Sequence, residues 1–596
     1  MSEKTYHILD VDLTAEQVQP IDVTADVKSF LGGRALGAKL LWDYVPPMAD
    51  PMGAENVLYI GIGPITGLMG SVTNVSAKSP LTFLRGQSNL NGHLGVELTY
   101  TDFNAGIIVR GKAKRPVYLF VHNDRIEIRD AASVWGKSGV ATQQALQQAI
   151  QKETGERNFR FLSMGPAGEK LVRNADICHD FYHHAARLGM GTVMGTKQLK
   201  AIAVKGTKDP GYVRPNVIFE MIQKVYRETR TYRSIHRRWG HTTSMAQRYY
   251  KTREGVKNKQ AGWHDICDLF NPVHLEQQYK VWSDSCHGCF VGCKVPYFHR
   301  HTDVGPCAGE MRHDNAGGWA ANAMIPGYEM QSYVSAYVDY LGLDSEDVSA
   351  VVTWAMECYE RGILSQEDLD GIDLTWGNLK AICALLKKIA YREGIGDLLA
   401  EGLKIAPQKL GRTSRSYAMT HKGTAISSYE LRGSMKEALD LAVTAVGELH
   451  GGRGTPLRVA YDSLTTCSFL RRELARIFNG AEGWAIPMLN AASGWRMTPD
   501  VWEKTMLRGA TIERCYAIRE GYQPERDDLL PDRFFNETIY DKYGAPKVLD
   551  RGEFLKKRRQ RYREYGLRDD GTPSKELLEN LDLDFTIPEL KKKIDL

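Results

Sequence analysis

Three cysteines in a C-x2-C-x3-C run constrain this 596-residue chain more than any other feature: Cys286, Cys289 and Cys293. Gly288 and Gly292 stand between them, so the segment can turn and bring three thiols to one point. Closely spaced cysteine triplets of this kind hold iron–sulfur clusters when a distant fourth cysteine completes the set. Structural zinc sites prefer paired C-x2-C or histidine-containing spacings. The spacing therefore favours an iron–sulfur cluster, with zinc and unliganded thiols as the alternatives.

Length and composition narrow the class of protein. A chain of 596 residues is too long for one core, so two to four domains are expected. A net charge of +5 gives no indication of nucleic-acid binding. The ten cysteines are scattered apart from the triplet, which suits a reducing cytoplasm better than a disulfide framework.

The termini and charge runs add expectations about location. The N-terminus lacks an apolar signal-peptide core, and no apolar run approaches the ~20 residues that span a bilayer. We therefore expect a cytoplasmic protein without a membrane segment. The basic runs at 556–561 and 591–593 are interpreted as solvated faces, with docking of an acidic electron carrier as the alternative.

Residues 5–210 show mostly the patterns of strands and turns. Apolar or alternating runs predict strands at 6–13, 56–61, 107–110, 117–121, 126–128 and 201–204, and a helix around 140–152. Three glycine clusters, at 32–37, 61–64 and 189–195, allow close approach of a backbone or a ligand. They could form a platform for a large flat cofactor or the tight turns of a β domain. Because glycine patterns alone are weak evidence, the tight turns are favoured.

From residue 211 onward the pattern becomes helical. Spacing of the 3.6-residue type predicts helices at 331–342, 346–361, 376–392 and 395–410. Turn-forming residues mark one boundary at 208–211 and a second at 412–418. The predicted class is α+β: a β-rich base domain at 1–210, then mostly helical domains at 211–415 and 416–596.

Two further motifs follow the cysteine triplet and carry a family resemblance. They are Asp339-Tyr340-Leu341-Gly342-Leu343-Asp344 and Asp462-Ser463-Leu464-Thr465-Thr466-Cys467. A C-x2-C-x3-C run followed by two D-x-x-G-L-[DC]-like motifs resembles the tungsten-dependent aldehyde:ferredoxin oxidoreductase family. Segments 31–34, 77–82, 87–89, 191–204, 429–433 and 447–450 agree with that family in the same order.

The resemblance implies one tungsten bound by the dithiolenes of two pterins, with a 4Fe-4S cluster beside it. Asp339 and Asp462 would bind the pterin rings, since a carboxylate accepts from ring N–H and amino donors together. Cys467 would be the fourth cluster ligand. The cofactor-binding residues implied are Asn89, His184, Asp339, Gly342, Leu343, Asp344, Asp462 and Thr466. Of these, Asn89 and the main-chain carbonyl of His184 match positions that hold a magnesium ion bridging the pterin phosphates.

Two departures from the family pattern concern the pterins. The second motif has Thr465-Thr466 where the family often has Gly-Leu, which leaves the geometry of its turn open. Val72 stands where many members carry a phosphate-contacting arginine, and Asn74 is the candidate replacement.

The resemblance also implies the reaction: an aldehyde is oxidised to its carboxylate, and electrons leave through the cluster to a ferredoxin or a small ferredoxin-like subunit. His450 is the predicted general acid/base, because an unperturbed imidazole pKa lies near working pH. The alternative for His450 is a structural helix-end histidine. Glu310 is the first candidate for the catalytic carboxylate, Asp314 the second, and Cys307 a thiol near the metal. His421 has no motif support and is expected to be structural or exposed.

Three other functions stay open at this point. The chain could be a class II benzoyl-CoA reductase-like subunit that reduces an aromatic acyl-CoA. It could be an iron–sulfur electron-transfer protein without catalytic tungsten, or a zinc-binding interaction protein. Metal analysis separates the last two from a tungsten enzyme. Both a homodimer and a hetero-oligomer are compatible with the sequence.

Overall fold

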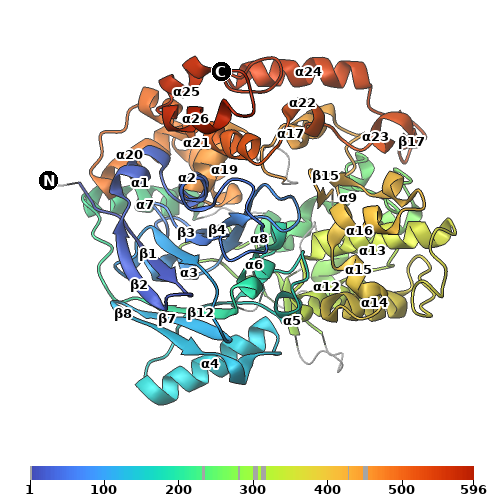
Figure 1. The fold of residues 1–596 in the computed structure, drawn as a ribbon, viewed down its shortest axis with the longest axis horizontal. Coiled ribbons are helices and arrows are strands. Elements are labelled where there is room, and N and C mark those ends of the chain that lie inside the picture. The colour runs from blue at the N-terminus through green and yellow to red at the C-terminus, as the bar shows by residue number, and fades with distance from the viewer. Residues whose placement is uncertain are drawn as a thin grey trace.

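A computed structural model describes residues 3–180, 182–230, 235–278, 282–299, 307–310, 317–426, 428–447 and 454–596. The predicted α+β class is confirmed, with a β-rich first region followed by mostly helical chain. Figure 1 shows the strands at the left and lower left, a helical lobe at the right and the C-terminal helices along the top. The domain boundaries near 210 and 415 stay predictions.

Two six-stranded sheets form the first region. The first has the order β2-β1-β6-β3-β4-β5, and the second has the order β11-β10-β9-β12-β7-β8. The first sheet contains β1 (His7–Asp12), β2 (Gln17–Asp22), β3 (Leu58–Gly61), β4 (Val72–Lys78), β5 (Arg85–Asn91) and β6 (Gly106–Arg110). The second contains β7 (Val117–His122), β8 (Arg125–Asp130), β9 (Arg160–Ser163), β10 (Ile177–His179), β11 (His183–Ala185) and β12 (Leu199–Lys205). The predicted strands and the hairpin between β7 and β8 are confirmed.

The two sheets share one apolar core with two short helices, α3 (Leu94–Thr99) and α6 (Met190–Thr196). The other face of the first sheet is covered by α2 (Gly33–Tyr44), α18 (Pro456–Ser463) and α21 (Pro499–Arg519), which belong to a second core. Two of these three helices come from the C-terminal part of the chain. The chain therefore returns to its first region, and this return brings the second predicted motif onto the sheet.

A third core holds the helical lobe together: α12 (Tyr328–Leu341), α13 (Ser345–Glu360), α14 (Leu379–Tyr391), α15 (Ile395–Leu399) and α16 (Gly402–Leu410). The single helix predicted at 395–410 is wrong, because the chain breaks between α15 and α16. Gly402 there has a φ of +72°, and an added Cβ would lie 2.8 Å from Leu81 Cδ2. The helix predicted from 376 begins at Leu379, where Asn378 caps it by accepting from the Ala381 N–H.

The remaining longer helices surround these cores. They are α4 (Gly139–Thr154), α7 (Pro215–Thr229), α17 (Met435–Ala442), α19 (Ser468–Ile477), α20 (Ala481–Ser493) and α24 (Arg551–Glu564). The helix expected around 140–152 is confirmed as α4, and the basic run 556–561 lies on α24. Within the described ranges, no helix combines the length and the apolar character needed to cross a membrane.

Candidate cofactor and cluster site

The cysteine triplet lies on a closed loop. Asp284 and Lys294 exchange backbone hydrogen bonds of 2.9 and 3.2 Å at its base. Inside the loop, the Cys289 N–H donates to the Cys286 carbonyl at 3.1 Å. The two glycines between the cysteines both have a φ of +61°, a conformation that a side chain would oppose. The predicted turn through the triplet is therefore present.

Cys467 joins this loop from a distant part of the chain. It stands at the N-terminus of α19 and belongs to the same apolar cluster as Cys289 and Cys293. Burial, and after it the nearby Cys467, raises the pKa of the Cys289 thiol. His241 Nε2 lies 3.6 Å from Cys293 Sγ, a contact of the kind that tunes cluster potentials. This set of thiols fits an iron–sulfur cluster, and its ligation by Cys286, Cys289, Cys293 and Cys467 stays a prediction.

The first motif forms a tight turn, which we call the first turn (residues 339–344). It follows α12, and Gly342 ends that helix with a φ of +78°. An added Cβ at Gly342 would lie 2.7 Å from the Gly165 Cα, so two glycine backbones touch. The Gly342 carbonyl accepts from the Asp176 N–H at 3.0 Å. The first turn is thereby fixed to the first region of the chain.

Asp339 of the first turn lies beside a histidine and a second carboxylate. His184 Nδ1 is 2.6 Å from Asp176 Oδ2, and His184 Nε2 is 3.7 Å from Asp339 Oδ2. The Asp339 side chain keeps 21% exposure. Asp176 and the imidazole of His184 were not predicted, because only the main chain of His184 was implicated by the resemblance. Asp339 is thus a carboxylate that lies partly at the surface beside an imidazole.

Two further residues of the first turn have structural contacts. Leu343 is buried in the core of the helical lobe. Asp344 accepts from the Glu346 N–H at the start of α13 and pairs with Arg187 Nη1 at 3.0 Å. Burial raises the pKa of Asp344 well above its usual range, although Arg187 opposes this shift. The contribution of Leu343 and Asp344 to cofactor binding stays a prediction.

The second motif, residues 462–467, forms the second turn in different electrostatic surroundings. Asp462 pairs with Arg34 Nη1 at 3.1 Å and with Arg458 Nε at 3.0 Å, and its side chain is 2% exposed. Arg34 also binds Glu513 at 2.7 Å, and Arg85 binds the same carboxylate at 2.6 Å. Asp462 is thus part of a buried arginine cage.

The cage carries more positive than negative charge. Its fourth guanidinium, Arg471, has a buried Nη1 without a hydrogen-bond partner among the described residues. Burial, and after it Arg458, lowers the pKa of Arg471 to about 10. Among the described residues, four guanidiniums face two carboxylates, Asp462 and Glu513, so the cage is suited to an anion such as a phosphate.

The sequence held partial signals for this cage. Arg458 stands four residues before Asp462, a spacing that places both on one helical face. Arg34 ends a segment that carried the resemblance, whereas Arg85 and Arg471 had no local signal. Asn74, considered as a replacement for the missing arginine at Val72, donates to Asn89 Oδ1 at 2.9 Å.

The geometry of the second turn is now defined. Thr465 adopts a φ of +56°, and the Thr466 N–H donates to the Tyr461 carbonyl at 3.1 Å. The turn therefore closes without a glycine of its own. Gly33 on the facing segment supplies the space, because an added Cβ there would lie 2.7 Å from the Asp462 carbonyl. In the glycine cluster at 32–37, Gly33 therefore allows two backbone segments to approach each other closely.

Asn89 and His184 lie on neighbouring strands. β5, which carries Asn89, packs beside β11, which carries His184. The Arg187 N–H donates to Ser88 Oγ at 3.2 Å and links the two segments. The predicted magnesium positions are thus on adjacent elements, and magnesium binding stays a prediction.

The candidate catalytic residues are only partly described. His450 and Asp314 lie outside the described residues. Cys307 and Glu310 stand at the two ends of β14 (Cys307–Glu310), which pairs with β13 (Pro296–His299) in an antiparallel ribbon. Their catalytic roles stay predictions.

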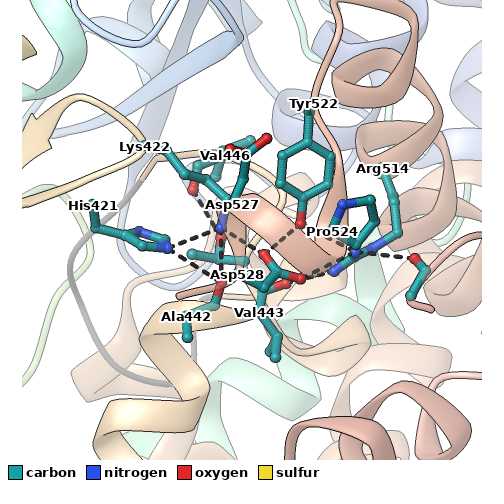
Figure 2. A network of polar contacts seen from close by, with 12 residues as sticks. His421, Lys422, Ala442, Val443, Val446, Arg514, Tyr522, Pro524, Asp527 and Asp528 are labelled. Atoms are coloured by element: carbon teal, nitrogen blue, oxygen red, sulfur yellow. Dashed lines mark hydrogen bonds and ion pairs between the residues drawn. The ribbon is translucent and has the colours of Figure 1, made fainter. Parts of the chain in front are cut away.

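A buried polar network holds the chain just before the segment that contains His450 (Figure 2). Lys422 donates to Asp528 Oδ1 and to the Ala442 carbonyl, both at 2.7 Å, and to His421 Nε2 at 2.9 Å. Arg514, which also pairs with Asp528, donates to the Val443 carbonyl at 2.6 Å. Lys422 and Arg514 both pair with Asp528, and both donate to carbonyls at the end of α17. The network thereby fixes the end of this helix.

Burial determines how this network is charged. It lowers the pKa of Lys422 to about 8, against the opposing effect of Asp528. It also lowers the pKa of His421 well below the usual histidine range, which suits an acceptor for the lysine N–H. These contacts agree with the structural role expected for His421.

A second group of possible metal ligands, His93, His179 and Asp180, has its ligand atoms within 4.8 Å of one another. His179 Nε2 already accepts from the N–H groups of His93 and Leu94 at 3.1 and 3.2 Å. Its Nδ1 lies 2.8 Å from the Phe161 carbonyl. Because both ring nitrogens of His179 already have hydrogen-bond partners, we interpret this group as structural.

Comparison with known proteins finds relatives over nearly the whole chain. The family model of the aldehyde ferredoxin oxidoreductase N-terminal domain matches residues 8–206, and that of domains 2 and 3 matches residues 218–456 and 453–583. An aliphatic sulfonate oxidoreductase, WOR-like subunit, of Pyrococcus furiosus is 33% identical over 99% of each chain. A tungsten-containing aldehyde ferredoxin oxidoreductase of the same organism is 32% identical over 93% of this chain and 94% of its own.

One solved structure has a similar fold over the whole chain. It is the active site complex BamBC of benzoyl coenzyme A reductase with 1,5 dienoyl-CoA, at a TM-score of 0.81 and 25% identity. The match covers 99% of both chains.

Proposed function

This chain belongs to the aldehyde ferredoxin oxidoreductase family, and we propose that it oxidises an aldehyde to its carboxylate and passes the electrons to a ferredoxin. The observation that carries the proposal is the apolar cluster that brings Cys467, the last residue of the second turn, together with Cys289 and Cys293 of the triplet. In the overall reaction, the aldehyde and one water yield the carboxylate, two electrons and three protons. The family implies a tungsten–pterin centre and an iron–sulfur cluster.

The residues present fit these groups. Asp339, which is partly exposed, and Asp462, within the arginine cage, would each accept from a pterin ring. The unpartnered Nη1 of Arg471 would bind a pterin phosphate, and Asn89 with the His184 carbonyl would hold the bridging magnesium. When bound, the tungsten centre supplies a two-electron acceptor and the cluster a one-electron exit.

The protein's own part in the reaction is positioning and proton transfer. His450 would take a proton from the water or the hydrated aldehyde, and Glu310 would polarise the carbonyl or accept a proton. The Lys422–Asp528 network fixes the backbone at Ala442 and orients the chain that leads to His450. We also propose that the enzyme works in a reducing cytoplasm, since no disulfide joins its described cysteines.

The test is anaerobic reduction of a viologen dye by a panel of aliphatic and aromatic aldehydes. Substitution His450→Asn should lower turnover by about 10²–10⁴-fold while metal and pterin stay bound. Full activity in this variant would show that His450 has a structural role, and Glu310 and Asp314 would then be substituted next.

A second candidate function has support from the solved relative. Because the benzoyl coenzyme A reductase complex shares the fold over the whole chain, the assay includes an aromatic acyl-CoA with a low-potential donor. An aliphatic sulfonate is included because of the sulfonate oxidoreductase relative. Turnover of either compound without any aldehyde activity would replace the aldehyde proposal.

A further inference from the structure

A surface groove of about 720 Å³ opens beside the predicted cluster. Its wall includes Cys289 of the triplet and Phe290 next to it. The lining also includes residues of α7 and Arg237 of α8 (Ile235–Trp239). The aliphatic part of Arg237 packs close to the cysteine loop, since an added Cβ at Gly292 would lie 3.5 Å from its Cγ. The groove is therefore a direct approach from solvent to the cysteines.

The groove is lined by positive charge. Arg227, Arg230 and Arg237 contribute to its wall, and no carboxylate does so among the described residues. Neither Arg227 nor Arg230 forms an ion pair with a described carboxylate. Such a wall attracts an acidic surface and repels a basic one.

The helices that carry the groove expose side chains of both charges outside its lining. Lys224 and Glu228 are exposed on α7 and Arg472 on α19. Arg238 of α8 pairs with Glu276 at 2.8 Å, and Arg476 of α19 pairs with Glu473 at 3.0 Å. Helices α8 and α19 lie side by side, because the rings of His236 and Phe469 are 4.6 Å apart.

The same wall exposes two large aromatic side chains. Phe219 and Tyr226 on α7 are 61% and 51% exposed, whereas Ile218 and Val225 on the inner face of that helix are buried. Exposed aromatic residues next to arginines are typical of protein interfaces. Helix α7 thus packs one face into the core and exposes aromatic side chains on a second face, where another protein could bind.

We propose that this groove docks a small acidic iron–sulfur electron carrier, an inference that rests on the proposed function. Arg227, Arg230 and Arg237 would pair with carboxylates of the carrier, while Phe219 and Tyr226 would cover apolar surface near its cluster. In each transfer the cluster of this chain loses one electron and the carrier's cluster gains it. No proton is transferred and no bond forms or breaks. The main structural requirement is therefore a short distance between the two clusters, which the groove provides at Cys289.

The basic run 556–561, which the sequence offered as an alternative docking point, lies on α24 and contributes nothing to the groove. It supplies a matched control. Arg227→Glu with Arg230→Glu changes the charge at the groove, and Lys556→Glu with Arg559→Glu makes the same change in charge at exposed positions of α24.

The experiment uses both holoenzyme variants and an acidic 4Fe-4S ferredoxin at low ionic strength. We expect the groove variant to bind the ferredoxin at least about tenfold more weakly, with a reduced dependence of the Kd on salt. The α24 variant should stay within about twofold of the unmodified enzyme. Equal weakening in both variants, or unchanged binding in the groove variant, would overturn the proposal.

A second arm separates docking from catalysis. Reduction of a small neutral quinone by the substrate should be the same in both variants and in the unmodified enzyme. If no aldehyde supports quinone reduction, the proposed function fails, while the Kd measurement still decides on the docking surface. Sedimentation completes the test: if the groove variant converts a dimer to a monomer, the groove's occupant is a second copy of this chain and the carrier proposal is wrong.

Discussion

The first turn and the second turn carry equivalent carboxylates in opposite electrostatic surroundings. Asp339 has His184 as its neighbour, with Asp176 behind it, and keeps 21% exposure. Asp462 is 2% exposed and held by Arg34 and Arg458. A ligand at the second turn must therefore share its carboxylate with the protein's own cations, whereas Asp339 offers a carboxylate that is more open.

The two turns also differ in where the glycine stands. In the first turn the motif itself contains Gly342, which meets the backbone at Gly165. In the second turn the motif contains Thr465, and the glycine that allows close approach is Gly33 on the facing segment. A tight contact between distant segments can thus have its glycine in the motif, as at the first turn, or on the facing segment, as at the second turn.

Breaking the arginine cage should have the largest effect on stability. Arg34→Met leaves Asp462 and Glu513 buried with one guanidinium fewer, so we expect a loss of about 3–5 kcal/mol in the free energy of unfolding. Denaturant unfolding measures the loss. The control Arg476→Met, at an exposed pair on α19, should cost less than about 1 kcal/mol. A similar small cost at Arg34 would show that the cage contributes little to stability.

Disturbing the glycine contact of the first turn should have the next largest effect. Gly342→Ala adds the strain of a positive φ to a collision with Gly165, about 2–4 kcal/mol together. The matched control is Gly362→Ala, at a φ of +67° with nothing within 4 Å, which should cost about 1–2 kcal/mol from strain alone. Equal losses would mean that the first turn yields to the added methyl group, against the tight docking described above.

The sequence predicted local features well and distant contacts poorly. The alternation in β1 and the helical period of α4 depend on neighbouring residues, and both elements form where expected. At the break before α16, an added Cβ at Gly402 would meet Leu81, more than three hundred residues away in the chain, and the helical spacing of 395–410 did not show this contact. The resemblance supplied Asp339 and Asp462 but not their surroundings.

The same limit applies to the residues around the candidate site. Arg34 and Glu513 are 479 residues apart in the chain, and their pairing exists only because α21 returns to the first sheet. The cysteine triplet was evident because its three members lie within eight residues of the chain. Cys467 was identified only because the second motif ends in it.

Neutralising Asp339 and Asp462 in turn compares the two turns directly. The smallest effect on stability is expected for Asp339, in the first turn. Asp339→Asn should change the free energy of unfolding by less than about 1 kcal/mol, because this carboxylate is partly exposed. The isolated protein should nevertheless contain less pterin. Asp462→Asn should lose pterin and stability together, since it removes the buried negative charge that Arg34 and Arg458 share. Pterin released and oxidised to its fluorescent form measures the content, and full pterin content in Asp339→Asn would exclude Asp339 as a ring ligand.

The metal content of the anaerobically purified protein tests the central claim, that the two turns and the cysteines hold a tungsten–pterin centre beside a 4Fe-4S cluster. We expect tungsten together with about four iron atoms per chain, and in Cys467→Ala we expect the tungsten to stay while the cluster's iron is lost. Zinc in place of both metals, or about four irons without tungsten and pterin, would contradict the account.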